Sequence, residues 1–189
     1  QHTADYDAAI SNWIRKKRDL QSSKYIESYS LIKTLRYGEN PHQKAFWYGL
    51  SNIGWNSAEQ LQGKELSYNN LLDLESALST VLEFGYEEKD IPTMNKSATV
   101  ILKHNNPCGA SIGNSASQSF LNALECDSVS AFGGIVAFNS NVDIETAINL
   151  KDIFLECVVA PSFDSEALEI LKIKKNLRIL KLSKDKLPK

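Results

Sequence analysis

The chain is organised around residues 98–110, ATVILKHNNPCGA. The apolar run Ala98–Leu102 predicts a buried strand. The strand delivers Lys103 and His104 to its end, and the Asn, Pro and Gly residues that follow are typical of a break in regular structure. Ligands of open α/β sheets bind in the crevice beyond the strand ends, so a cation beside a titratable base there indicates a candidate site. A solvated lysine and a loop histidine bonded to backbone would explain the same residues without chemistry.

Strand and helix patterns alternate after residue 97, which predicts an α/β layered domain with a largely parallel sheet. The strands are expected at 98–102, at 135–138 after a loop with paired glycines, at 157–160 and at 177–182, and the helices at 115–124, 143–154 and 165–171. Earlier in the chain, the patterns predict helices at 3–18 and 57–61, strands at 24–33 and 45–48, and a long helix beginning at Asn69–Asn70. Asn70 and Asp73 have the spacing of a capping box for that long helix.

Composition limits the classes of partner. The 189 residues fit one domain or slightly more, with 42% hydrophobic and 23% charged residues and a net charge of -2. This balance gives no reason to expect nucleic acid or a membrane as a partner. Three cysteines are an odd number and favour a reducing compartment, so a cytoplasmic location is expected. The beginning of the chain lacks the pattern of a signal peptide.

A zinc site is one hypothesis for the residues after the predicted strand. Pro107–Cys108 resembles part of the zinc deaminase signature. However, Asn106 stands where the proton-shuttling Glu belongs, and Ser111 stands where a second cysteine belongs. No zinc is therefore expected, although a zinc-dependent deaminase stays as the weaker alternative. Its candidate ligands are His104, Cys108, Cys126 and Cys157.

Acid–base chemistry without a metal is the second hypothesis. His104 would accept a proton from a weak nucleophile, and Lys103 would stabilise the negative charge that develops on an acyl oxygen. Arg36 would hold an anionic group of the substrate, and Tyr37 could offer a hydroxyl or a ring face. A surface Arg36 paired with Glu39 is the alternative.

Six ordered segments together carry a family resemblance. They are 2–7 (HTADYD), 35–43 (LRYGENPHQ), 62–70 (QGKELSYNN), 102–110 (LKHNNPCGA), 130–137 (SAFGGIVA) and 158–163 (VVAPSF). The chain resembles the transformylase portion of the bifunctional purine-biosynthesis family, which combines aminoimidazole-carboxamide ribonucleotide (AICAR) transformylase with IMP cyclohydrolase. The family transfers a formyl group from 10-formyltetrahydrofolate to the 5-amino group of AICAR without zinc, and it works as a homodimer.

The resemblance implies a fold, a division of the chain and site residues. The fold would be a cytidine-deaminase-like, three-layer α/β subdomain with a mostly parallel or mixed sheet. Residues 1–23 would form an N-terminal linker helix, and residues 24–189 the first such subdomain of the transformylase. His104 matches the proton acceptor, and Lys103 matches the residue that stabilises the transition state. The substrate-binding positions would be Arg36, Tyr37, His104, Gly133 and Glu156.

Length is where the chain departs from this family. The second transformylase half and the cyclohydrolase domain are not in these 189 residues, so residues that contact the reduced folate stay unassigned. A chain that carries only part of the site could also be a non-catalytic nucleotide-binding or assembly module. Formyl transfer that depends on His104 would distinguish the enzyme from that module.

Overall fold

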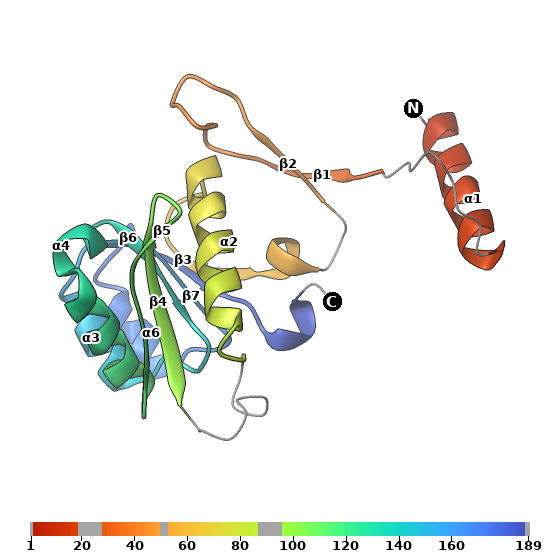
Figure 1. The fold of residues 1–189 in the computed structure, drawn as a ribbon. Helices are drawn as coiled ribbons and strands as arrows, with labels where there is room; N and C mark the ends of the chain where they lie inside the picture. Colours follow the sequence, from red (N-terminus) through yellow and green to blue (C-terminus); the bar gives the residue numbers. More distant parts are fainter. Residues whose placement is uncertain (1, 19–27, 50–52, 87–95, 188–189) are drawn as a thin grey trace.

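The computed structural model describes residues 2–18, 28–49, 53–86 and 96–187. Its centre is a six-stranded sheet in the order β3-β8-β7-β6-β4-β5 (Figure 1). The strands are β3 (Glu59–Gln62), β4 (Ser97–Lys103), β5 (Asn106–Gly113), β6 (Gly134–Phe138), β7 (Leu155–Ala160) and β8 (Arg178–Lys181).

The sheet is mixed. Strands β6, β7 and β8 are parallel to one another, whereas β4 is antiparallel to both of its neighbours and β3 is antiparallel to β8. The α/β class with a mixed sheet is thus confirmed, but the expectation of a largely parallel sheet is wrong. The physical reason is the β4–β5 hairpin. A hairpin reverses the direction of the chain, whereas a βαβ crossover keeps it, so β4 runs opposite to β6.

Helices cover both faces of the sheet, which makes three layers (Figure 1). One face packs on α2 (Tyr68–Leu82), whose Leu74, Ala77 and Val81 are fully buried against β4, β6 and β7. The opposite face packs on three helices and the short α4 that follows the first of them. These are α3 (Ala116–Cys126), α4 (Ser128–Ala131), α5 (Ile144–Lys151) and α6 (Ser165–Leu171).

Helix α2 begins one to two residues earlier than its pattern indicates. Ser67 is the N-cap, and its Oγ accepts from the Asn70 backbone N at 3.2 Å, while Asn70 Oδ1 accepts from Ser67 N at 3.1 Å. The capping box therefore joins Ser67 to Asn70, and the expected pairing of Asn70 with Asp73 is wrong. This shift leaves the Asp73 carboxylate and the Asn70 amide nitrogen for contacts outside the helix.

Residues 106–113 form strand β5, although their composition predicts a break. Lys103 pairs with Asn106, so His104 and Asn105 form a two-residue hairpin turn. Both turn residues have positive φ, 52° and 59°, as a type I′ turn requires. Pro107 is tolerated because β5 is an edge strand, where a missing N–H leaves no partner unpaired.

Two other predicted elements differ in the structure. Residues 57–61 are not a helix: a 3-10 turn, η1 (Gly54–Ser57), ends there and β3 begins at Glu59, because pairing with β8 decides the conformation of this polar segment. The strand predicted at 24–33 appears as β1 (Ser30–Thr34), and residues 19–27 lie outside the described part of the chain.

The N-terminal part is built differently from the sheet layers. Helix α1 (His2–Arg18) lies apart from them, and β1 pairs with β2 (Phe46–Gly49) to form a separate two-stranded arm (Figure 1). We call residues 30–49 the β1–β2 arm. The described chain ends in a 3-10 turn, η3 (Lys184–Lys186). Among the described residues, no helix has the length and apolar character needed to cross a membrane.

Candidate functional site

One edge of the sheet gathers most of the predicted site residues. Strand β4 ends there and β6, β7 and β8 begin there, since Leu102, Ile135, Cys157 and Arg178 form one row of paired residues across the four strands. We call this the β4-end edge. Lys103, His104, Gly133 and Glu156 all lie on its outer side. The site was expected beyond the end of the strand that delivers Lys103 and His104. The structure places it there, at an edge where β3 and β4 end and the parallel strands β6, β7 and β8 begin.

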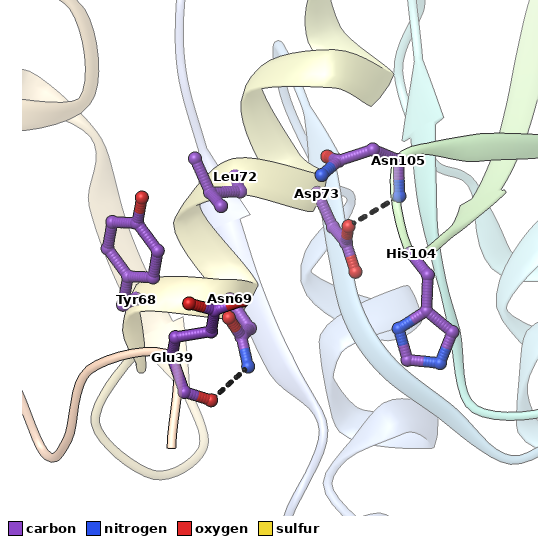
Figure 2. Close-up of a pocket in the computed structure, with 7 residues that line it drawn as sticks. All are labelled: Glu39, Tyr68, Asn69, Leu72, Asp73, His104 and Asn105. Atoms are coloured by element: carbon purple, nitrogen blue, oxygen red, sulfur yellow. Dashed lines mark hydrogen bonds between the residues drawn. The ribbon is translucent and has the colours of Figure 1, made fainter. Parts of the chain in front are cut away.

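His104 projects from the hairpin turn beside a cleft of ≈ 320 Å³ (Figure 2). The cleft is lined by Glu39, Tyr68, Asn69, Leu72, Asp73, His104 and Asn105. His104 is exposed, so solvent or a ligand reaches its imidazole directly. A positive φ costs an L-residue roughly 1–2 kcal/mol, so the turn that carries His104 needs support from its surroundings.

Lys103 leaves the strand on the opposite face of the sheet from the cleft. Ile101 packs in the core on the α3 side and Leu102 in the core on the α2 side, so alternation directs Lys103 to the α3 side. There its Nζ donates to the Phe132 carbonyl at 2.7 Å. Burial raises the pKa of the nearby Cys108 thiol and the Lys103 charge opposes that rise. Lys103 and His104, the predicted catalytic pair, are therefore adjacent in sequence but lie on opposite faces of the sheet.

Gly133 and Gly134 lie where α4 leads into β6, and each position favours glycine for a separate reason. Gly133 has a φ of 78°, which favours glycine, and its N–H donates to the Phe154 carbonyl at 2.8 Å. A Cβ on Gly134 would lie 2.7 Å from the Leu102 carbonyl oxygen. The pair therefore makes a tight turn that also lets β6 approach the end of β4.

Glu156 occupies a β-bulge at the start of β7. Gly134 pairs with Leu155 and Ile135 pairs with Cys157, so Glu156 is the extra residue between them. Bulges redirect side chains and are frequent beside active sites. The Glu156 Oε2 accepts from Asn70 Nδ2 at 2.7 Å and lies 3.8 Å from an Arg178 guanidinium nitrogen.

Arg36 and Tyr37 reach the site through the start of α2 and do not line the cleft. The Tyr37 carbonyl accepts from Tyr68 N at 3.4 Å, and the Glu39 carbonyl accepts from Asn69 Nδ2 at 3.1 Å (Figure 2). The Arg36 guanidinium lies over the Tyr37 ring, 5.5 Å from its centroid. These contacts hold the turn of the β1–β2 arm against the helix that lines the cleft.

The cysteines do not gather around His104. Cys126 is exposed on α3, and Cys157 is fully buried in the core on the α2 side. Burial raises the pKa of the Cys157 thiol far above its usual range, against the opposing effect of Arg178. In the ranges that the structure describes, no group of three or more His, Cys, Asp or Glu side chains is arranged to hold a metal ion.

Three polar residues of the β4-end edge were not predicted from the sequence to be site residues. Asn70 orients Glu156, Arg178 pairs with it, and Asp73 Oδ1 accepts from the backbone N of Asn105 at 2.8 Å. Asn70 and Asp73 were considered only as helix-capping residues. The available signal for Arg178 was its position inside the predicted strand 177–182, between two apolar residues. In the structure it is 8% exposed.

The comparison with protein families decides what kind of protein carries this edge. Residues 1–189 match the family model described as the AICARFT/IMPCHase bienzyme. The chain belongs to this bienzyme family. The expected family is thus confirmed over the whole sequence.

Curated members of the bienzyme family are close in sequence and much longer. The Bifunctional purine biosynthesis protein PurH of Prochlorococcus marinus strain CCMP1986 is 90% identical over 188 residues, which cover 100% of this chain and 36% of the relative. The PurH of strain MIT 9312 is 89% identical over 189 residues, or 37% of its length. The chain therefore spans little more than a third of these bienzymes.

Solved structures resemble the chain only in part. Form 1 of Acinetobacter baumannii RibD is 19% identical, with a TM-score of 0.38, over 57% of this chain and 33% of that one. Form 2 gives a TM-score of 0.39 over 56% of this chain. A likeness of this extent has no bearing on the chemistry of the β4-end edge.

Proposed function

We propose that this chain supplies the catalytic pair and part of the nucleotide pocket for formyl transfer from 10-formyltetrahydrofolate to the 5-amino group of AICAR. Membership of the bienzyme family supports the reaction. The observation that carries the assignment is the exposed His104 on a hairpin turn beside the ≈ 320 Å³ cleft. IMP cyclohydrolase activity belongs, in this proposal, to the rest of the bienzyme.

His104 acts as the general base. The aromatic 5-amino group is a weak nucleophile because its lone pair is conjugated with the ring and its carboxamide. As its nitrogen attacks the formyl carbon, the His104 imidazole accepts the departing proton. The bond from the formyl carbon to N10 of the folate then breaks, and N10 takes up a proton, so tetrahydrofolate leaves.

Lys103 stabilises the oxygen of the formyl group as it becomes negative. An ammonium group has three N–H donors, and the Phe132 carbonyl occupies one of them. The other two N–H groups are available to the oxyanion. Because Lys103 lies on the face opposite His104, the oxyanion must lie at the rim of the sheet for both side chains to reach the reacting group. Interactions with an oxygen whose charge grows in the transition state lower the barrier rather than tighten substrate binding.

The nucleotide is held by the remaining predicted residues. Arg36 binds the phosphate and Tyr37 packs beside it, since a guanidinium matches phosphate in geometry and charge. Both described contacts of Glu156 fall on Oε2, so Oε1 accepts hydrogen bonds from ribose or carboxamide. The Gly133 turn admits the ligand close to the backbone.

We also propose the division, assembly and location that the family implies. Residues 1–23 are a linker, of which the structure describes α1 (His2–Arg18), and 24–189 are a cytidine-deaminase-like subdomain; the separate position of α1 supports this division. The full bienzyme is a homodimer. Exposed apolar side chains on the β1–β2 arm support this, with Leu31, Phe46 and Tyr48 each more than half exposed. Three free cysteines favour a cytoplasmic location.

A chimera tests the function. This chain replaces its 90% identical counterpart in the Prochlorococcus relative, and tetrahydrofolate formation is followed with AICAR and 10-formyltetrahydrofolate. His104→Ala is expected to lower kcat about 100-fold or more, as loss of a general base does. The matched control is His2→Ala at the exposed start of α1, which leaves kcat unchanged. Transfer that survives in the His104→Ala chimera refutes the assigned base and favours a non-catalytic module.

A further inference from the structure

Helix α2 holds the turn that carries His104. Asp73 Oδ1 accepts a hydrogen bond from the backbone N of Asn105 at 2.8 Å (Figure 2). The Asn105 side chain meets the same stretch of helix. With its amide nitrogen toward α2, it lies 2.9 Å from Ser76 Oγ and 3.1 Å from the Leu72 carbonyl oxygen. The turn is therefore bonded to α2 through both its backbone and its side chain.

The turn needs such support because of its backbone conformation. His104 and Asn105 are the two non-glycine residues with positive φ in the described ranges. Asparagine visits this region more readily than most residues, but neither residue has the freedom of the glycine common in two-residue hairpins. A hydrogen bond to the Asn105 N–H favours the conformation in which that N–H points at α2.

Asp73 is well placed to fix a neighbour. The next residue along the helix, Leu74, is fully buried, as are Ala77 and Val81 one and two turns on. The backbone of Asp73 is thus anchored to the sheet core, and a carboxylate that accepts a backbone N–H forms a charge-assisted bond. Sites held by packed helices keep their geometry better than sites held by loops alone.

We propose that Asp73 is a positioning residue: its carboxylate holds the His104–Asn105 turn in the left-handed conformation and thereby directs the His104 imidazole into the cleft. This inference rests on the proposed function, because it assigns Asp73 to the placement of the proposed base. Asp73 also lines the cleft, so the competing explanation is direct contact between its carboxylate and the substrate.

Two substitutions in the chimera separate these explanations. Asp73→Ala removes the acceptor and is expected to lower kcat on the order of 10- to 100-fold, because small misplacements of a catalytic group have effects of this size. The KM for AICAR stays within about threefold, since the positioning role does not include substrate binding. Asp73→Asn keeps an oxygen that accepts from the Asn105 N–H, so it retains most of kcat.

The matched control is Asp143→Ala. Asp143 Oδ1 accepts from the Thr146 backbone N at 2.8 Å at the N-cap of α5, on the opposite face of the sheet. Its removal breaks the same kind of bond at the same distance, and it is expected to leave kcat within about twofold. A loss of kcat in both alanine variants points to general destabilisation and overturns the proposal.

Hydrogen exchange gives a readout that does not depend on activity. Measured by mass spectrometry in the chimera, the Asn105 amide is expected to exchange about tenfold faster in Asp73→Ala than in the parent, and unchanged in Asp143→Ala. An Asn105 amide that is unprotected in the parent overturns the proposal. So does a raised KM with kcat unchanged, or an Asp73→Asn variant as impaired as Asp73→Ala. A parent chimera that transfers no formyl group refutes the proposed function, and exchange at Asn105 still decides whether Asp73 holds the turn.

Discussion

Replacement of Asn70 tests whether the first turn of α2 stabilises the β4-end edge. Asn70 is 5% exposed and serves two partners. Its Oδ1 accepts from the Ser67 backbone N at 3.1 Å, which closes the capping box, and its Nδ2 donates to Glu156 Oε2 at 2.7 Å. Asn70→Ala removes both bonds and leaves the Ser67 N–H without its partner inside the protein.

The two losses give the size of the effect. A capping interaction contributes about 1 kcal/mol. A hydrogen bond to a charged group contributes roughly 1.5–3 kcal/mol when buried, and we take about 1 kcal/mol because the Glu156 side chain is 45% exposed. Asn70→Ala should therefore lower the free energy of unfolding by about 2 kcal/mol. For a chain of this size that lowers Tm by roughly 4–8 °C.

Urea unfolding followed by circular dichroism measures this change, with the m-value as a check that the unfolded state is unaltered.

Asn70→Asp makes the test sharper. It keeps an acceptor for the Ser67 N–H but places a second carboxylate against Glu156, so at pH 7 it should be less stable than Asn70→Ala. Asn69→Ala is the control. Within the described ranges its exposed amide bonds only the Glu39 carbonyl, so the substitution should change stability by less than about 0.5 kcal/mol. An Asn70→Ala variant as stable as this control would refute the reasoning.

Three further changes test the packing around the edge. Gly134→Ala should lower the free energy of unfolding by about 1–3 kcal/mol in thermal denaturation, because its Cβ would lie 2.7 Å from the Leu102 carbonyl oxygen. Leu74→Ala, at a fully buried position, should lower it by about 2–5 kcal/mol in urea. A thiol reagent at pH 8 should label the exposed Cys126 and spare Cys157 until the chain is unfolded. Burial raises the pKa of the Cys157 thiol, so the folded state keeps this proton after the unfolded state has lost it. Stability should therefore fall above pH about 8.5, by up to ~1.4 kcal/mol per pH unit from this thiol. In Cys157→Ala the fall should be smaller, with the contribution of Cys108 remaining.

Elements with a clear local pattern were predictable from the sequence. Helix α6 has the predicted bounds, Ser165–Leu171, and β4 extends its predicted apolar run by one residue at each end. Both follow from periodicity that tertiary contacts reinforce. The fold class followed from the same alternation of patterns.

The elements that were missed depend on contacts that no local pattern encodes. Strand β5 contains Asn106, Pro107 and two glycines, and it forms because His104 and Asn105 adopt a turn usually made with glycine. Strand β3 is polar, and pairing with β8 makes it a strand. Both errors fall where the chain pairs with a distant segment or adopts a conformation that its residues do not favour.

The candidate site divides along the same line. The family resemblance placed Lys103, His104, Gly133 and Glu156 in one site, and the structure brings all four to the β4-end edge. The resemblance did not indicate that the side chains of Lys103 and His104 lie on opposite faces of the sheet. That follows from the alternation of β4 side chains between two core clusters. Nor did the resemblance indicate the bulge at Glu156, which depends on how β7 pairs with β6.

The supports of the site converge on the first two turns of α2. Tyr68 and Asn69 bond the turn of the β1–β2 arm, Asn70 bonds Glu156 on β7, and Asp73 bonds the hairpin turn at the end of β4. Residues 70 and 73 are three apart and so share one face of the helix, which is directed at the sheet edge. One helix start thus sets the relative positions of three segments that carry the proposed nucleotide and catalytic residues. Rotation or fraying of that start would displace all three together, so substitutions at Asn70 and Asp73 should alter the site more than their own distance from the reacting atoms indicates.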